Sequence, residues 1–194
     1  MRRPYRMTAR AELVALTGER ILDAAVSAFW ERPGEPITLD EVAQRAGVTV
    51  QTVIRRFGGR DGLFAAATER ELARVRAERD PSSVRDTGEA VAQLVRHYEA
   101  MGDGVLGLLA EELRVPALRD VAEAGRRFHR SWCSAVFAGA LTGLTGAPRD
   151  RRLAQLVAVC DVYTWKLLRR DSGLSSSETE LAIQELLEPL LEGS

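Results

Sequence analysis

Hydrophobic and polar positions alternate along this chain with the period of an α-helix, and no useful stretch has the two-residue alternation of a strand. In residues 18–30 the apolar side chains recur every three or four residues, which predicts one amphipathic helix. Residues 38–57 predict two short helices that meet at a glycine. Proline, glycine and capping residues then separate further helical runs, which we place at about 61–79, 87–101, 105–115, 116–144, 149–170 and 177–191. The pattern therefore predicts an all-α fold of about nine helices.

The pair of short helices carries the clearest local signals. Thr38 and Glu41 have capping-box spacing, in which the hydroxyl accepts from the third helical N–H and the carboxylate reaches back to the cap N–H. Gly47 should end this helix, because glycine enters the left-handed conformation at little steric cost. Thr49 offers the N-cap of the next helix. This pattern predicts a helix-turn-helix whose second helix reads the DNA major groove, and an ordinary corner between two helices is the alternative.

The placement of charge favours the DNA interpretation. The net charge is −1, from 27 basic and 28 acidic residues, and by itself does not discriminate between classes of function. Residues 1–11 and 42–60, however, each contain four arginines and no carboxylate, as phosphate contact requires. A solvated charged face would explain either stretch alone. Together with the helix pair, the two stretches indicate a DNA-binding surface.

The block from about Thr17 to Ala67 resembles the DNA-binding domain of the TetR (tetracycline-repressor-like) family of bacterial regulators. The likeness lies in a helix ending in Phe29-Trp30, the segment Pro36–Ala43, the turn Ala46–Thr49, and Phe57 followed by a basic residue and Leu63. It implies phosphate contacts from Thr38, Thr49 and Arg60, and base or mixed contacts from Val50, Gln51, Thr52, Arg55 and Arg56.

Ile54 departs from the family pattern, in which a tyrosine usually stands at this position. Isoleucine has no hydroxyl to offer a phosphate, so the side chain is expected to make an apolar contact, such as one with a thymine methyl group.

The resemblance also implies a division into an N-terminal arm and three-helix DNA-binding domain, residues 1–62, and a helical regulatory and dimerisation domain, residues 63–194. A small-molecule effector would bind among the middle helices, about 87–144. Its candidate contacts, each of which is more often simply core or surface, are His97, Tyr98, Met101, Phe128, His129, Trp132 and Phe137.

The last two helices, about 149–191, have apolar residues on more than one stripe, which indicates burial within the domain or against a partner. By the same resemblance we expect a homodimer through these helices. A two-fold dimer sets its reading helices about one DNA turn apart and requires a near-palindromic operator on double-stranded DNA.

Nothing in the sequence indicates catalysis, a cofactor or a metal. There is no glycine-rich phosphate loop, and neither the histidines nor the cysteines have metal-ligand spacing. Cys133 and Cys160 are expected to be reduced core residues, which suits the cytoplasm. No apolar run reaches the roughly 20 residues of a membrane span, and no signal peptide is expected.

These features predict a homodimeric, ligand-responsive transcriptional repressor and no enzyme. Two alternatives remain at this stage: a regulator of the same fold that activates transcription or binds a protein partner, and a helical interaction module that does not bind DNA.

Overall fold

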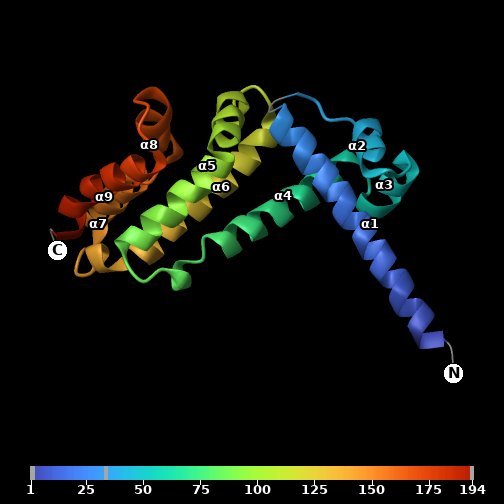
Figure 1. Cartoon of the computed structure of the whole chain (residues 1–194), viewed down its shortest axis with the longest axis horizontal. Coiled ribbons are helices and arrows are strands. Elements are labelled where there is room, and N and C mark those ends of the chain that lie inside the picture. Colours follow the sequence, from blue (N-terminus) through green and yellow to red (C-terminus); the bar gives the residue numbers. More distant parts are fainter. Residues whose placement is uncertain (1–2, 33–34, 193–194) are drawn as a thin grey trace. The chain divides into compact units, whose positions relative to one another are not determined.

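The computed structural model describes residues 3–32 and 35–192 of the chain. Within these ranges there are nine α-helices, three short 3₁₀ or π segments and no strand, which confirms the all-α prediction (Figure 1). The chain divides into two compact units, Met1–Ala73 and Arg74–Ser194. That division falls inside the fourth helix, later than the boundary at residue 62 that the sequence predicts.

The first unit contains α1 (Arg3–Glu31), α2 (Leu39–Ala46), α3 (Val50–Phe57) and the first part of α4 (Arg60–Glu78) (Figure 1). The helix predicted over residues 18–30 is confirmed as part of α1. The helix begins earlier, at Arg3, and continues through the segment expected to form an arm. The acid-free arginines of residues 1–11 have side chains outside the described part. The core of this unit is formed by small and branched side chains of all four helices: Ile21, Leu22, Ala24, Ala25, Val42, Ala43, Ala46, Val53, Leu63 and Ala67.

In the second unit, α5 (Thr87–Glu111) runs without a break through Gly102 and Gly104, so the prediction of two helices, 87–101 and 105–115, is wrong. Gly102 has a packing role, because a Cβ atom there would lie 2.5 Å from the Trp165 ring. Glycine at this position lets an aromatic ring approach the helix backbone, whereas the sequence pattern indicates a helix end.

The helices that follow are shorter than predicted. The α6 helix (Pro116–Val136) ends before a 3₁₀ segment, η2 (Ala138–Leu141), and does not reach residue 144. The predicted helix 149–170 is two helices, α7 (Gly146–Val159) and α8 (Val162–Lys166), followed by a π segment, η3 (Leu167–Asp171). Asp161 causes the break, because its carboxylate accepts from the Tyr163 N–H at 3.0 Å and caps a new helix. The last helix, α9 (Ser176–Glu192), agrees with its prediction.

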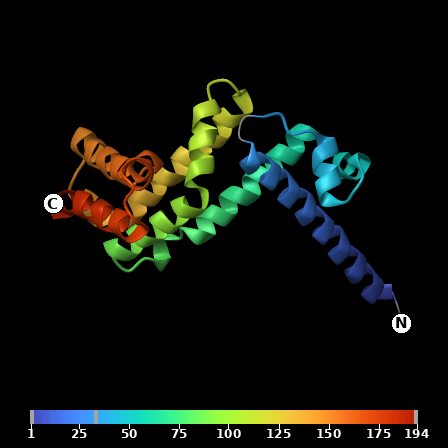
Figure 2. The same cartoon turned by 45° about the horizontal axis from the view of Figure 1, so that its top comes forward.

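The helices of the second unit enclose their own core. The α5 helix packs against α6, α8 and α9, while α6 also packs against α7, as both views of the cartoon show (Figures 1 and 2). The largest fully buried side chains here are Trp132, Trp165, Leu94, Leu156, Ile183 and Leu187. No helix in the described ranges is long and apolar enough to cross a membrane.

Candidate nucleic-acid interface

The local structure of α2 follows the sequence signals at both ends. The Thr38 hydroxyl accepts from the Glu41 N–H at 3.2 Å and caps the helix. At the other end Gly47 has φ 63°, the left-handed conformation that the sequence predicts. The Val48 N–H donates to the Ala43 carbonyl at 2.9 Å, which closes the helix end. The turn between the two helices is therefore fixed by backbone hydrogen bonds and one glycine.

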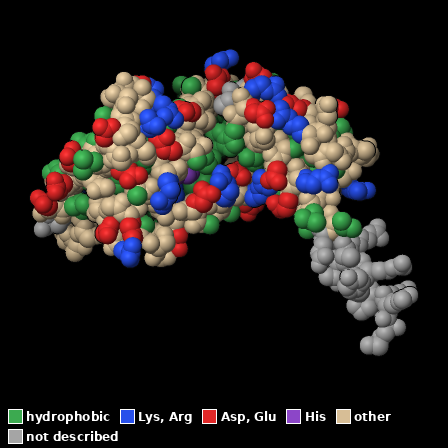
Figure 3. All heavy atoms as spheres, in the orientation of Figure 1, with side chains coloured by type: hydrophobic (Ala, Val, Ile, Leu, Met, Phe, Trp, Pro, Cys, Tyr) green, Lys and Arg blue, Asp and Glu red, His purple; other side chains and the backbone are tan. Residues whose placement is uncertain are grey.

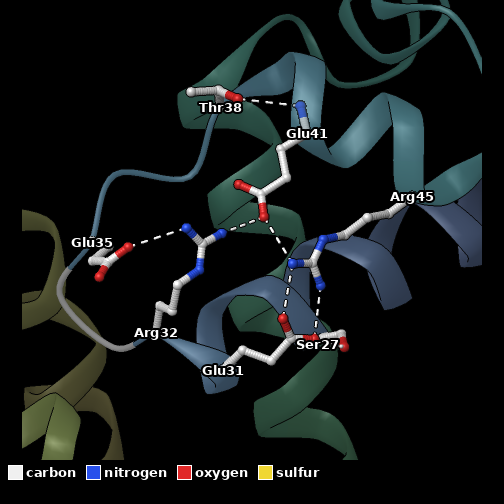
Figure 4. A network of polar contacts seen from close by, with 7 residues as sticks. All are labelled: Ser27, Glu31, Arg32, Glu35, Thr38, Glu41 and Arg45. Atoms are coloured by element: carbon white, nitrogen blue, oxygen red, sulfur yellow. Dashed lines mark hydrogen bonds and ion pairs between the residues drawn. The ribbon is translucent and has the colours of Figure 1, made fainter.

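The carboxylate of Glu41 does not complete the predicted capping box. It accepts hydrogen bonds from two arginines, Arg32 at the end of α1 and Arg45 within α2, the latter at 2.8 Å (Figure 4). A guanidinium is a stronger partner for a carboxylate than a neutral backbone N–H, and two of them lie within reach. Glu41 thus ties α2 to α1.

Arg45 belongs to the acid-free stretch that the sequence assigns to phosphate contact, and the structure gives it carboxylate partners. Its guanidinium binds both oxygens of Glu31, at 2.7 and 2.8 Å (Figure 4). The hydrogen bond from Arg45, helped by one from Ser27, lowers the pKa of Glu31 to about 2. Two carboxylates, those of Glu31 and Glu41, thus engage Arg45, which lessens its availability for DNA.

One buried side chain and a cap at each end fix the position of α3. Val53 is fully buried in the core of the first unit. The Thr49 hydroxyl accepts from the Thr52 N–H at 3.3 Å, as the sequence predicts, and Gly58 ends the helix with its N–H donating to the Ile54 carbonyl at 2.8 Å. The opposite face of α3 is left to solvent because only Val53 is buried.

Most of the nine predicted DNA contacts are exposed, on α3 or beside it. Seven of these nine side chains are exposed: Thr38, Thr49, Gln51, Ile54, Arg55, Arg56 and Arg60. Val50 and Thr52 are half-buried, and Val50 also packs against the core. Ile54, a large apolar side chain, is 43% exposed.

The three arginines at the end of this motif differ in their surroundings. Arg55 has no ion pair with a described residue. Arg56 packs over Gly18 of α1, where a Cβ atom would overlap the guanidinium. The Arg60 Nε donates to the Ile37 carbonyl at 3.1 Å, which brings this cation beside the Thr38 cap. Arg60 and Thr38 are therefore held together at the start of α4 and α2.

A close approach explains one further glycine in this turn. A Cβ atom on Gly62 would overlap the Phe57 carbonyl oxygen, so the first turn of α4 closes onto the end of α3 only with glycine there.

Sequence reasoning missed Arg20, which also fixes the motif. Its guanidinium donates to the carbonyl of Ala46, the last residue of α2. Carbonyls at a helix end lack partners within the helix, so a cation there is favourable. The two residues are 26 positions apart, and no spacing in the sequence signals the contact.

The candidate effector contacts all lie in the second unit, and most are part of its interior. Tyr98, His129, Trp132 and Phe137 are buried, while His97, Met101 and Phe128 are half-buried. Several adjoin one another: Trp132 lies 6.1 Å from Phe137 and 6.4 Å from His129 between ring centroids. The Met101 sulfur accepts a hydrogen bond from Arg74 at 3.1 Å.

The structure adds one residue that the sequence did not indicate. Arg79, which directly follows α4, has its guanidinium 4.3 Å from the Trp132 ring centroid and 5.4 Å from that of Phe128. No group of three or more histidine, cysteine or acidic side chains in the described ranges has the arrangement of a metal site.

Charged side chains of both signs are mixed over the face seen in Figure 3.

Residues 21–67 match the family model described as bacterial regulatory proteins, tetR family. An uncharacterized HTH-type transcriptional regulator of Mycobacterium tuberculosis (strain CDC 1551 / Oshkosh) is 37% identical over 68 residues, which are 35% of this chain and 34% of that protein. The chain thus spans about a third of the length of the curated relative it matches.

Solved structures share the fold over most of the chain. A transcriptional regulator from Rhodococcus sp. Rha1 has a TM-score of 0.66 and 23% identity, over 91% of this chain and 96% of that one. The transcriptional regulator FadR from Bacillus subtilis, solved in complex with stearoyl-CoA, has a TM-score of 0.58 and 16% identity, over 91% and 98% of the two chains. These likenesses establish a common helical architecture for both units.

Proposed function

We propose that the chain is a regulator of the tetR family, a repressor that binds a near-palindromic operator as a dimer. The match of residues 21–67 to the family model supports this proposal. A small-molecule effector in the second unit releases it from DNA. The observation that carries the proposal is the exposed side of α3, with Gln51, Ile54 and Arg55 in solvent opposite the buried anchor Val53. Such a regulator works in the cytoplasm, where the operator is.

The surface of the last helices supports a dimer. The α8 and α9 helices contribute buried residues to the core. Four large apolar side chains on α8, η3 and α9 are nevertheless exposed: Tyr163, Leu167, Leu181 and Leu186. Exposed apolar groups of this size on adjacent elements favour burial by a second copy. The α8 and α9 helices fit the predicted dimer segment, 149–191.

Aromatic and polar side chains around His129 and Trp132 line the interior of the second unit. They support the proposal that a small-molecule effector binds there. The transcriptional regulator FadR from Bacillus subtilis, which shares this fold, was solved in complex with stearoyl-CoA. By analogy the effector of this chain would lie within its second unit.

Operator recognition is tested by fluorescence anisotropy on DNA from the region flanking the chain's own gene. We expect tight binding to one near-palindromic segment and weak, strongly salt-dependent binding elsewhere. Weak binding that is independent of sequence at every salt concentration would contradict the proposal. A reporter assay with the gene deleted separates repression, which predicts increased expression, from activation.

Two kinds of substitution distinguish the phosphate contacts from the base contacts. Arg60→Ala should weaken binding to all DNA sequences and make the dependence on salt shallower, because it removes a phosphate contact. Gln51→Ala and Arg55→Ala should change the preference between operator variants, with a cost of roughly 1 to 3 kcal/mol at the affected base pair. Arg127→Ala in α6 is the control, and equal losses on every sequence for the three test variants would refute this division.

A further inference from the structure

Arg79 is a cation inside the second unit. The residue is 3% exposed, and its guanidinium stacks over the Trp132 ring at 4.3 Å. One terminal nitrogen, Nη2, lies 3.2 Å from Nδ1 of His129. Aromatic and histidine side chains thus surround a positive charge.

Among the described residues, no carboxylate forms an ion pair that balances that charge. The described residues provide no ion pair for Arg79, although they provide carboxylate partners for other arginines such as Arg169 and Arg170. An arginine side chain stays protonated, and an unpaired charge in the interior has a large unfavourable solvation free energy. The neighbouring imidazole of His97 is held neutral, because burial lowers its pKa to about 3 and Arg79 and Arg74 act in the same direction.

Donor groups in the same region also lack acceptors. Arg79 Nε and Trp132 Nε1 are buried and have no hydrogen-bond partner in the structure, and His97 Nδ1 is a third buried nitrogen without one. The first two atoms only donate, so what they lack is an acceptor. An anion supplies acceptor atoms and the missing negative charge together, whereas water supplies only the acceptors.

One internal group competes for the role of counter-ion. A hydrogen bond from Cys160 lowers the pKa of the Cys133 thiol to about 5, with smaller effects in the same direction from His129 and Arg79. A Cys133 thiolate would neutralise Arg79 from within, and the test below separates it from an external anion.

We propose that Arg79, with Trp132 beside it, binds the carboxylate of an organic monocarboxylic acid, and that this acid is the class of effector that the chain senses. This assignment rests on the proposed function. Arg79 has one unbalanced charge, and the other nearby arginine, Arg74, has an ion pair with Glu78 at 2.7 Å. One unbalanced cation fits one carboxylate, and the rings of Phe128 and Phe137, which adjoin Arg79 and Trp132, fit an apolar body.

Calorimetric titration of the full chain with octanoate, phenylacetate and benzoate tests the proposal, with the corresponding neutral amides in parallel. We expect at least one carboxylate to bind, and its amide to bind at least tenfold more weakly. Arg79→Met should weaken carboxylate binding roughly ten- to a hundredfold, because it removes a charged hydrogen-bonding partner. Binding of none of the three acids, or equal binding of acids and amides, would overturn the proposal.

Two further variants keep the test independent of whether Arg79→Met folds. Trp132→Phe retains the aromatic ring without the indole N–H and should weaken binding roughly three- to tenfold. Arg127→Met, at an exposed arginine of α6 with one ion pair to Glu123 at 3.4 Å, should leave binding unchanged. If the carboxylates bind only to Cys133→Ser and not to the wild type, the resident thiolate is the counter-ion and the proposal is wrong.

The same samples separate this inference from the proposed function. Operator binding that no carboxylate relieves, in a protein that binds no carboxylate, contradicts the inference and leaves the repressor assignment intact. Carboxylate binding that depends on Arg79, in a protein without any operator, contradicts the repressor assignment and supports the site.

Discussion

The ring of Trp165 in α8 lies against the backbone of Gly102 in α5, where a Cβ atom would come within 2.5 Å of it. Trp165 is fully buried, and its indole N–H donates to Glu99 at 3.2 Å, so the ring has little freedom to move away. We expect Gly102→Ala to destabilise the fold by about 1 to 3 kcal/mol through overpacking. Chemical denaturation measures the loss.

Gly125 in α6 is the matched control, because it is also helical and, apart from its chain neighbours and the nearby backbone of its own helix, no atom lies within 4 Å of the place that its Cβ atom would take. Gly125→Ala should stabilise the protein by about 0.5 to 1 kcal/mol, since alanine costs less backbone entropy in a helix. Opposite signs at the two glycines are the expected result. A neutral Gly102→Ala would mean that the Trp165 ring shifts freely.

Thr49 is expected to serve both the fold and DNA binding, and two substitutions separate the roles. Thr49→Ala should cost about 1 kcal/mol of stability, because the cap on the Thr52 N–H is lost. Thr49→Asp keeps a capping oxygen and should leave stability nearly unchanged, yet weaken operator binding because the carboxylate repels phosphate. Denaturation and anisotropy on the same samples measure the two effects, and unchanged operator affinity in Thr49→Asp would remove Thr49 from the DNA contacts.

The ion pair between Glu31 and Arg45 predicts a dependence on acid. The pKa of Glu31 is lowered from 4.5 to about 2 in the folded protein, so its contribution to stability is present above pH 4.5 and is lost as the pH falls toward 2. The stability advantage of the wild type over Glu31→Gln should shrink across this interval. Because the pair is exposed to solvent, the advantage should be small and should also decline with salt.

Titration of the Glu31 carboxyl by NMR tests the cause directly. In Arg45→Gln the pKa of Glu31 should rise toward 4.5, because the largest lowering contribution is removed. Glu188→Gln, on α9, serves as the control for general charge effects. A Glu31 pKa that stays near 2 without Arg45 would assign the shift to another group.

Dimer formation is tested on α9. Leu181 is 56% exposed, and Leu181→Glu should convert the dimer to a monomer, since a carboxylate buried in an apolar interface is strongly unfavourable. Leu113, which is 81% exposed between α5 and α6, provides a control in Leu113→Glu. Sedimentation or light scattering gives the masses, and a dimer that survives Leu181→Glu would place the interface elsewhere.

The contrast between the two units shows which features a sequence predicts. The caps at Thr38 and Thr49 and the turn at Gly47 are predictable because each depends on residues within a few positions. Gly102 is misleading in the sequence because its reason is a ring that lies 63 positions later in the chain. Arg79 gives no signal at all, since its surroundings come from His129 and Trp132, about 50 positions away.

The four charged side chains Glu31, Arg32, Glu41 and Arg45 connect the end of α1 to α2 across the segment between them (Figure 4). Linked segments tend to open together, so amide hydrogens in the last turn of α1 and in α2 should exchange with solvent at similar rates. Neutralising Glu41 should uncouple those rates. The electrostatic network would then act as a cooperative unit of local unfolding, in addition to fixing the position of one helix.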